Sequence, residues 1–176
     1  MRANKGGAAV MSKKALVVID IQNDITKHYR DIIDTINVAI DWAMDLGMTV
    51  IYIKHNNLSP NTRTFKPDTK GSELAPELKV VSPHIFVKTK ANALTSGDFS
   101  EYIRENGIDE FYITGADATG CVKSTCFNMT KAGYLVYVIS DCVTSYDLKK
   151  ILDMLTYYAD KGCEVITLAE YKKGDL

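Results

Sequence analysis

Three side chains able to do acid–base or nucleophilic chemistry stand where apolar runs of the sequence end. Asp20 follows ALVVI, Lys88 follows HIFV, and Cys121 lies in the turn after EFYIT. If these runs are parallel strands, their carboxyl ends meet at one edge of a sheet, where ligands bind in open α/β folds. An acid, an ammonium and a thiol at one edge suit nucleophilic catalysis, with Cys121 as nucleophile and Asp20 as its base.

Cys121 has the most reactive setting of the cysteines. The segment ITGADATGCVKST indicates a strand, a glycine-containing turn and the start of a helix. A thiol at a helix N-terminus faces the positive end of the helix dipole, which lowers its pKa. The alternative is a small buried residue, since free cysteines usually pack in cores. We interpret Cys126, Cys142 and Cys163 in that second way.

Other patterns do not support a nucleotide or metal site. Gly115 and Gly120 have the spacing of a phosphate-binding loop, but that motif needs lysine directly after the second glycine, and here Cys121 and Val122 precede Lys123. The histidines are His28, His55 and His84. No two of them have the spacing of a metal motif, and the cysteines form no CxxC pair. The sequence therefore predicts no metal and no cofactor.

The elements that must position these side chains alternate between apolar runs and helix-like segments. The runs are rich in β-branched and aromatic residues and apolar on both faces, which is typical of doubly covered parallel strands. They are Ala15–Ile19, Met48–Ile53, His84–Val87, Glu110–Thr114, Tyr134–Ile139 and Cys163–Ile166. The helix-like segments are Tyr29–Leu46, Phe99–Glu105, Cys121–Ala132 and Tyr146–Asp160. The alternation predicts a three-layer α/β/α Rossmann-like fold with a six-stranded parallel sheet.

Two segments lie outside this alternation. Residues 55–82 are polar and rich in turn residues, and a loop of this length in a compact domain usually serves a function. We expect it to help build a pocket or a subunit contact, with an ordinary surface loop as the alternative. Residues 1–12 are basic and rich in small residues, and we treat them as a disordered or tag-like extension of a domain at 13–176.

The composition limits the classes of partner that the protein is expected to bind. The 176 residues suffice for one domain with its own core, and 21 basic against 22 acidic residues give a net charge of −1. Such a chain lacks the cationic surface that nucleic acids or anionic membranes require. No apolar run approaches the roughly 20 residues of a membrane span, and the amino terminus lacks the apolar core of a signal peptide. We expect a cytoplasmic protein that acts on a small molecule.

Four motifs in this order resemble the isochorismatase-like cysteine hydrolases. They are VVIDIQND at 17–24, GSELAPEL at 71–78, FVKTKANAL at 86–94 and ITGADATGCVKST at 113–125. The resemblance continues through AGYLVYVISDCVTS at 132–145 and covers nearly all of residues 14–166. Each motif alone is weak, whereas Asp, Lys and Cys in this order and at these separations are specific.

The resemblance implies a role for each residue. Asp20, the first acid of the DxQxD motif, matches the general base of the family, Lys88 its triad lysine and Cys121 its nucleophile. A non-proline cis peptide of the family maps to the Ala116–Asp117 bond. The backbone N–H groups of Asp117 and Cys121 would then form the oxyanion hole. The resemblance also implies the strand order 3-2-1-4-5-6 and a homo-oligomer, either a dimer or a tetramer.

The implied reaction is metal-independent hydrolysis of a C–N bond in a small amide or ureido substrate, through a thioester. A second class in the family cleaves the vinyl ether of isochorismate, and its specialist members do not need the cysteine, so Cys121 favours an amidase. Nicotinamidases carry an Asp and two His near the second strand to bind a metal, whereas residues 54–57 here are KHNN. Ile25 and Leu94 stand where relatives often have aromatic residues, which leaves the substrate open. A non-catalytic binding or assembly protein on this fold is the remaining alternative.

Overall fold

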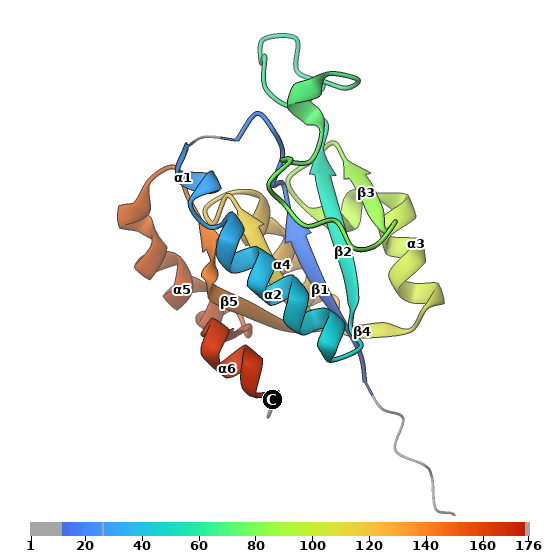
Figure 1. Ribbon diagram of the computed structural model, residues 1–176, viewed down its shortest axis with the longest axis vertical. Helices are drawn as coiled ribbons and strands as arrows, with labels where there is room; N and C mark the ends of the chain where they lie inside the picture. The colour runs from blue at the N-terminus through green and yellow to red at the C-terminus, as the bar shows by residue number, and fades with distance from the viewer. Residues whose placement is uncertain (1–11, 26, 175–176) are drawn as a thin grey trace, which may run out of the picture.

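The predicted alternation is confirmed as one six-stranded parallel sheet between two layers of helices (Figure 1). The structure is a computed structural model that describes residues 12–25 and 27–174, so most of the expected tag-like extension lies outside the described residues. The strand order is β3-β2-β1-β4-β5-β6, as the resemblance implies. The strands are β1 (Lys13–Ile19), β2 (Thr49–His55), β3 (Ile85–Lys88), β4 (Ile108–Ala116), β5 (Leu135–Thr144) and β6 (Glu164–Ile166).

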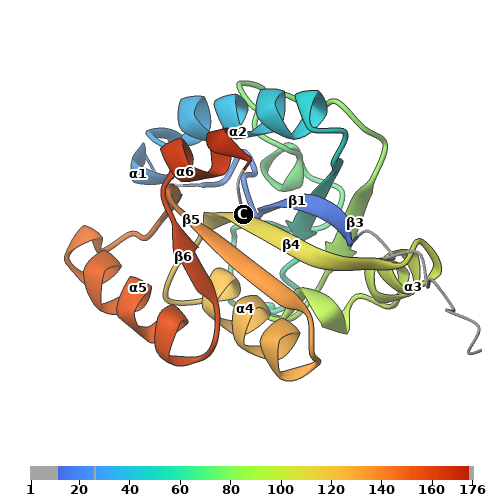
Figure 2. The same ribbon diagram turned by 90° about the horizontal axis from the view of Figure 1, so that it is seen from below.

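Helices cover both faces of the sheet (Figure 2). One layer contains α1 (Lys27–Arg30), α2 (Ile33–Asp45) and α6 (Leu168–Lys173). The other layer contains α3 (Gly97–Glu105), α4 (Cys121–Lys131) and α5 (Ile151–Asp160). Short 3-10 turns occur at Lys70–Ser72, Ala93–Thr95 and Leu148–Lys150. None of the described helices is long and apolar enough to span a membrane.

The central strand β1 shows why the runs are apolar throughout. Successive side chains of a strand point to opposite faces of the sheet. Leu16 and Val18 pack in the cluster on the α2 side, whereas Ala15 and Val17 pack in the cluster on the α4 side. All four are fully buried. Two hydrophobic cores therefore hold the sheet rigidly beneath its carboxyl edge.

For two helices, the bounds predicted from the sequence are wrong. The segment Tyr29–Leu46 is not one helix, because a turn at residues 31–32 separates α1 from α2. The Tyr29 hydroxyl donates a hydrogen bond to Asp117, which ties α1 to the turn between β4 and α4. The helix expected from Tyr146 begins later, at Ile151, because the Tyr146 N–H also binds Asp117.

The end of the chain also differs from the prediction. The strand expected to end at Ile139 continues to Thr144, with a register irregularity against β4 between Ile113 and Gly115. Helix α6 was not predicted, although its sequence carries a start signal: Thr167 and the residue at N3, Glu170, form a capping box.

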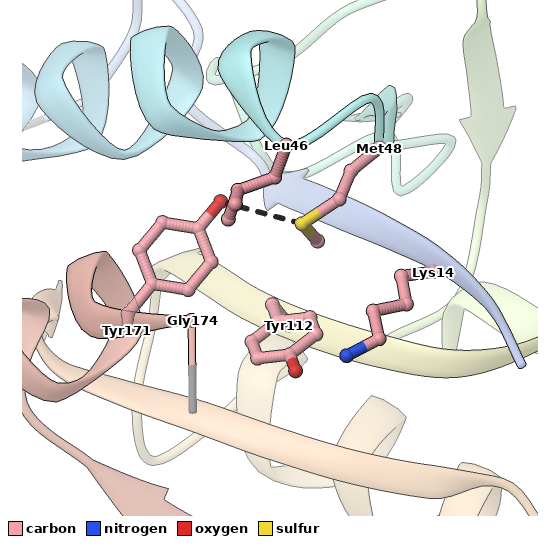
Figure 3. A pocket seen from close by; sticks show the side chains of 6 residues that line it. All are labelled: Lys14, Leu46, Met48, Tyr112, Tyr171 and Gly174. Carbon is pink, nitrogen blue, oxygen red and sulfur yellow. Dashed lines mark hydrogen bonds between the residues drawn. The ribbon is translucent and has the colours of Figure 1, made fainter. Parts of the chain in front are cut away.

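A small cavity of about 120 Å³ lies at the opposite edge of the sheet from Asp20, near the starts of β1 and β2 (Figure 3). It is lined by Lys14, Leu46, Met48, Tyr112, Tyr171 and Gly174. The Tyr171 hydroxyl donates to the Ala39 carbonyl at 3.1 Å and lies 3.7 Å from Met48 Sδ. This cavity belongs to the packing of α6 on the sheet, away from the carboxyl edge.

Candidate active site

The three residues predicted to do chemistry meet at the carboxyl edge of the sheet. Lys88 Nζ lies 3.0 Å from Asp20 Oδ2 and 3.2 Å from Cys121 Sγ. The side chains of Lys88 and Asp20 are 0% and 5% exposed, so the ion pair is shielded from water. Cys121 is partly exposed. The ion pair therefore lies in a low-dielectric environment beside a residue that keeps some exposed surface.

Asp20 is placed by a close approach of β1 and β4. The strand ends at Ile19, and Asp20 adopts the left-handed conformation with φ 57° while its N–H donates to the Ile53 carbonyl at 2.9 Å. Gly115 pairs with Ile19 and has φ 116°. A Cβ on Gly115 would lie 2.1 Å from the Ile19 oxygen. Only glycine permits this contact, which sets the point where Asp20 leaves the sheet.

The turn between β4 and α4 is fixed by the Asp117 side chain. The peptide bond between Ala116 and Asp117 is cis. Burial alone would raise the pKa of Asp117, but hydrogen bonds to its carboxylate outweigh burial and lower that pKa. The donors are the Thr119 N–H and hydroxyl, the Ser145 hydroxyl, the Tyr146 N–H and the Tyr29 hydroxyl. Within the described residues, the N–H groups of Asp117 and Cys121 donate no hydrogen bond, so both can bind an oxyanion.

The thiol of Cys121 is protonated at neutral pH, contrary to the sequence-based expectation of a lowered pKa. Burial and then the Asp20 carboxylate raise the pKa of Cys121 to about 12, against the opposing effect of Lys88. Among the described residues, Asp20 Oδ1 is buried without a hydrogen-bond partner, which leaves one carboxylate oxygen free to accept a proton.

The remaining residues of the DIQND segment bind the long loop, a role that the sequence analysis missed. Gln22 Nε2 donates to the carbonyls of His55 at 3.0 Å and Ser72 at 2.8 Å, and Gln22 Oε1 accepts from the His55 N–H at 2.8 Å. Asp24 Oδ2 accepts from the Phe65 N–H at 2.7 Å. The loop at 55–82 is therefore anchored beside the strand end that carries Asp20. The sequence signal for this role was the polar pair Gln22 and Asp24, an amide and an acid at alternate positions after the strand.

His55 is a fourth polar side chain in this cluster. Its Nδ1 lies 3.0 Å from Lys88 Nζ. The pKa of His55 is lowered by burial and by Lys88, against the opposing effects of Asp20 and the Lys90 carbonyl. No role for His55 was predicted from the sequence, because its contact to Lys88 depends on the pairing of β2 with β3.

The same cluster contains three side chains of metal-binding type. Asp20, His55 and Cys121 each offer one ligand atom, and these atoms lie within 4.8 Å of one another. Three such donors could serve zinc. However, Lys88 Nζ lies within 3.2 Å of an atom of each of the three side chains. A metal ion bound by these atoms would therefore lie beside this ammonium.

The fold is a three-layer α/β/α architecture around a parallel sheet, and comparison with known proteins identifies the family. Residues 14–170 match the isochorismatase domain. The chain belongs to the isochorismatase family and is an isochorismatase-family hydrolase.

Relatives cover most of the chain. The uncharacterized isochorismatase family protein YrdC of Bacillus subtilis (strain 168) is 27% identical over 164 residues, which are 89% of this chain and 86% of that protein. Pyrazinamidase of Pyrococcus horikoshii, solved in complex with zinc, has a TM-score of 0.79 and 22% identity, over 88% of this chain and 99% of that chain. N-carbamoylsarcosine amidase from Thermoplasma acidophilum has a TM-score of 0.77 and 23% identity, over 89% of this chain and 96% of that chain.

Proposed function

We propose that this protein is a cysteine-dependent amidase that hydrolyses the C–N bond of a small amide or ureido compound. The observation that carries the proposal is the Lys88 ammonium, 3.0 Å from the Asp20 carboxylate and 3.2 Å from the Cys121 sulfur. The names of the two structural relatives, a pyrazinamidase and an N-carbamoylsarcosine amidase, support an amide or ureido bond as the target.

Acylation begins with the transfer of the thiol proton. Asp20 Oδ1 takes the proton from Cys121 while the sulfur attacks the substrate carbonyl carbon. The carbonyl oxygen becomes an oxyanion, which the N–H groups of Asp117 and Cys121 bind. Asp20 then gives the proton to the leaving nitrogen, the C–N bond breaks, and ammonia or an amine departs from a thioester.

Deacylation runs through the same groups. Asp20 takes a proton from water, the water oxygen attacks the thioester carbon, and the C–S bond breaks. The proton returns to the Cys121 sulfur, and an acid is released. The Lys88 ammonium stabilises the negative charge that moves between Asp20 and the sulfur. Because the resting thiol has a raised pKa of about 12, the proton leaves as the carbon–sulfur bond forms rather than beforehand.

The proposed reaction needs no metal ion. A metal would polarise the carbonyl or lower the pKa of a water molecule. The two free N–H groups and the thiol offer these functions already, and the Lys88 ammonium lies among the candidate ligands. Dialysis against a chelator should leave the rate unchanged. Loss of activity that zinc, iron or manganese restores would contradict this proposal and favour a nicotinamidase-like metal enzyme.

The experiment that tests the function is ammonia release from a panel of small amides and ureido acids. The wild-type chain is compared with Cys121→Ser and with Cys142→Ser, a cysteine of β5 that is buried in the core on the α2 side. We expect turnover in wild type and Cys142→Ser and none in Cys121→Ser. Hydrolysis of isochorismate that survives in Cys121→Ser would favour vinyl ether cleavage instead. The expected homo-oligomer stays a prediction, which light scattering after size exclusion would test.

A further inference from the structure

The Lys88 ammonium has three N–H bonds and three acceptors. These are Asp20 Oδ2 at 3.0 Å, His55 Nδ1 at 3.0 Å and Cys121 Sγ at 3.2 Å. The Lys88 side chain has no exposed surface, so water cannot readily replace any of them. A lysine ammonium donates three hydrogen bonds and accepts none. His55 therefore binds the one N–H that the proposed reaction leaves unassigned.

We propose that His55 is a positioning residue, whose neutral ring holds the Lys88 ammonium between the base and the nucleophile. This inference rests on the proposed function, because it assigns a supporting role in the same site. Without an acceptor at His55, the ammonium could rotate about the end of its side chain and would satisfy Asp20 at the expense of Cys121. The ring fixes that rotation, so that one N–H stays directed at the sulfur.

The ring can do this in only one protonation state. Nδ1 must carry a lone pair to accept from an ammonium, so the ring is neutral with its proton on Nε2. A protonated ring would place a second positive charge 3.0 Å from Lys88. The charged groups facing His55 are Asp20 and Lys88, with the Cys121 thiol beside them. Burial and the ammonium lower the pKa of His55, which favours the neutral ring.

The orientation of His55 is set by its surroundings. Its N–H and carbonyl both bind the Gln22 side chain, at 2.8 and 3.0 Å. The Phe65 ring packs edge-on against the imidazole, with centroids 6.2 Å apart and planes at 81°. Phe65 itself has φ 54° and donates its N–H to Asp24. The ring is therefore held from the DIQND segment and from the long loop together.

The test compares two substitutions at one position. In His55→Asn, the amide oxygen can replace Nδ1 as an acceptor, but the side chain cannot be protonated. In His55→Leu, the volume is similar and the acceptor is lost. His84→Asn is the matched control, because His84 contacts Tyr102 and lies outside the cluster. Two readouts are measured for each variant: kcat and KM for ammonia release, and the rate of Cys121 alkylation by iodoacetamide at pH 8.

We expect kcat of His55→Leu to fall about tenfold or more, with little change in KM. A fall of about tenfold is the factor expected for losing one hydrogen bond to a charged group. Alkylation should also slow, because Lys88 lowers the pKa of the Cys121 thiol only while its ammonium is held beside the sulfur. His55→Asn should restore most of both rates and remove the decline in kcat that protonation of the ring causes at acidic pH, in a range below that of an ordinary histidine because the pKa of His55 is lowered. His84→Asn should match wild type.

Each other result decides the matter. Equal losses of rate in His55→Asn and His55→Leu would mean that the ring contributes only packing. Wild-type rates in both variants would mean that the ring does not position the Lys88 ammonium. Either result overturns the positioning role. The alkylation rates need no substrate, so they test His55 even if Cys121→Ser retains turnover and the proposed function fails. Dependence of wild-type turnover on added zinc would assign His55 to a metal instead and overturn the proposal.

Discussion

The buried pair of Asp20 and Lys88 allows stability and catalysis to be separated by a double-mutant cycle. The two side chains are 5% and 0% exposed, and their charged atoms lie 3.0 Å apart. Lys88→Met leaves a carboxylate buried without its partner, and Asp20→Asn leaves an ammonium in the same position. Removing one member of a buried ion pair costs about 3–5 kcal/mol, since the remaining charge is uncompensated. A domain has only about 5–15 kcal/mol of total stability, so each single variant should be strongly weakened.

The double variant Asp20→Asn with Lys88→Met should be more stable than either single variant. It removes both charges, and exchange of a buried pair for neutral side chains is often close to neutral in free energy. The coupling between the two sites should therefore reach several kcal/mol, as expected for charges in direct contact. Activity should follow a different course, because all three variants lack a group of the proposed mechanism and should show no turnover.

Urea unfolding measures these free energies directly. Trp42 is the single tryptophan of the chain and lies in α2, packed against the sheet, so its fluorescence reports on the intact core. The slope of free energy against urea should be unchanged across the four proteins. If the double variant loses as much stability as the two single variants summed, the charges are not coupled, and the argument for a shielded ion pair is wrong.

Three further predictions concern nearby features. Gly115→Ala should lower stability by about 3 kcal/mol or more or prevent folding, because its Cβ would lie 2.1 Å from a backbone oxygen of β1. Circular dichroism checks this against Gly97→Ala, which has nothing within 4 Å and should fold normally. Gly71→Ala brings a Cβ within 2.1 Å of the Asp24 carboxylate, so proteolysis of the loop should quicken while the sheet stays folded. Alkylation of Cys121 should quicken steadily up to at least pH 10, given its pKa of about 12. It should also precede alkylation of the other three cysteines, which are buried. A plateau of the Cys121 rate near pH 8, measured by mass spectrometry, would contradict the first expectation.

The sheet was predictable because its strands are buried on both faces. Each central strand is a short apolar run, and the residue after the run stands at the carboxyl edge, which placed Asp20 and Lys88 correctly at that edge. The helix start at Cys121 was also visible, since a glycine-containing turn precedes it. Periodicity and turn signals were therefore sufficient for the six strands and for the places of these polar side chains.

Features that depend on tertiary contacts were not predictable in this way. The break before α2 follows from the bond between Tyr29 and Asp117, two residues far apart in the chain. The raised pKa of Cys121 depends on how deeply the thiol is buried, whereas the sequence shows only its helix start. The contact of His55 with Lys88 exists only because β2 and β3 pair in one particular register.

The protonated state of the Cys121 thiol has a consequence for the durability of the protein. Oxidation by peroxides proceeds through the thiolate, so susceptibility follows thiolate character and exposure. A thiol with a pKa of about 12 is almost entirely S–H at neutral pH, even though part of Cys121 is exposed. Without a carbonyl to attack, the sulfur is a poor target for oxidants and for electrophilic metabolites. In the proposed mechanism, this sulfur is thus protected in the empty site and becomes reactive only while a substrate carbonyl is bound against it.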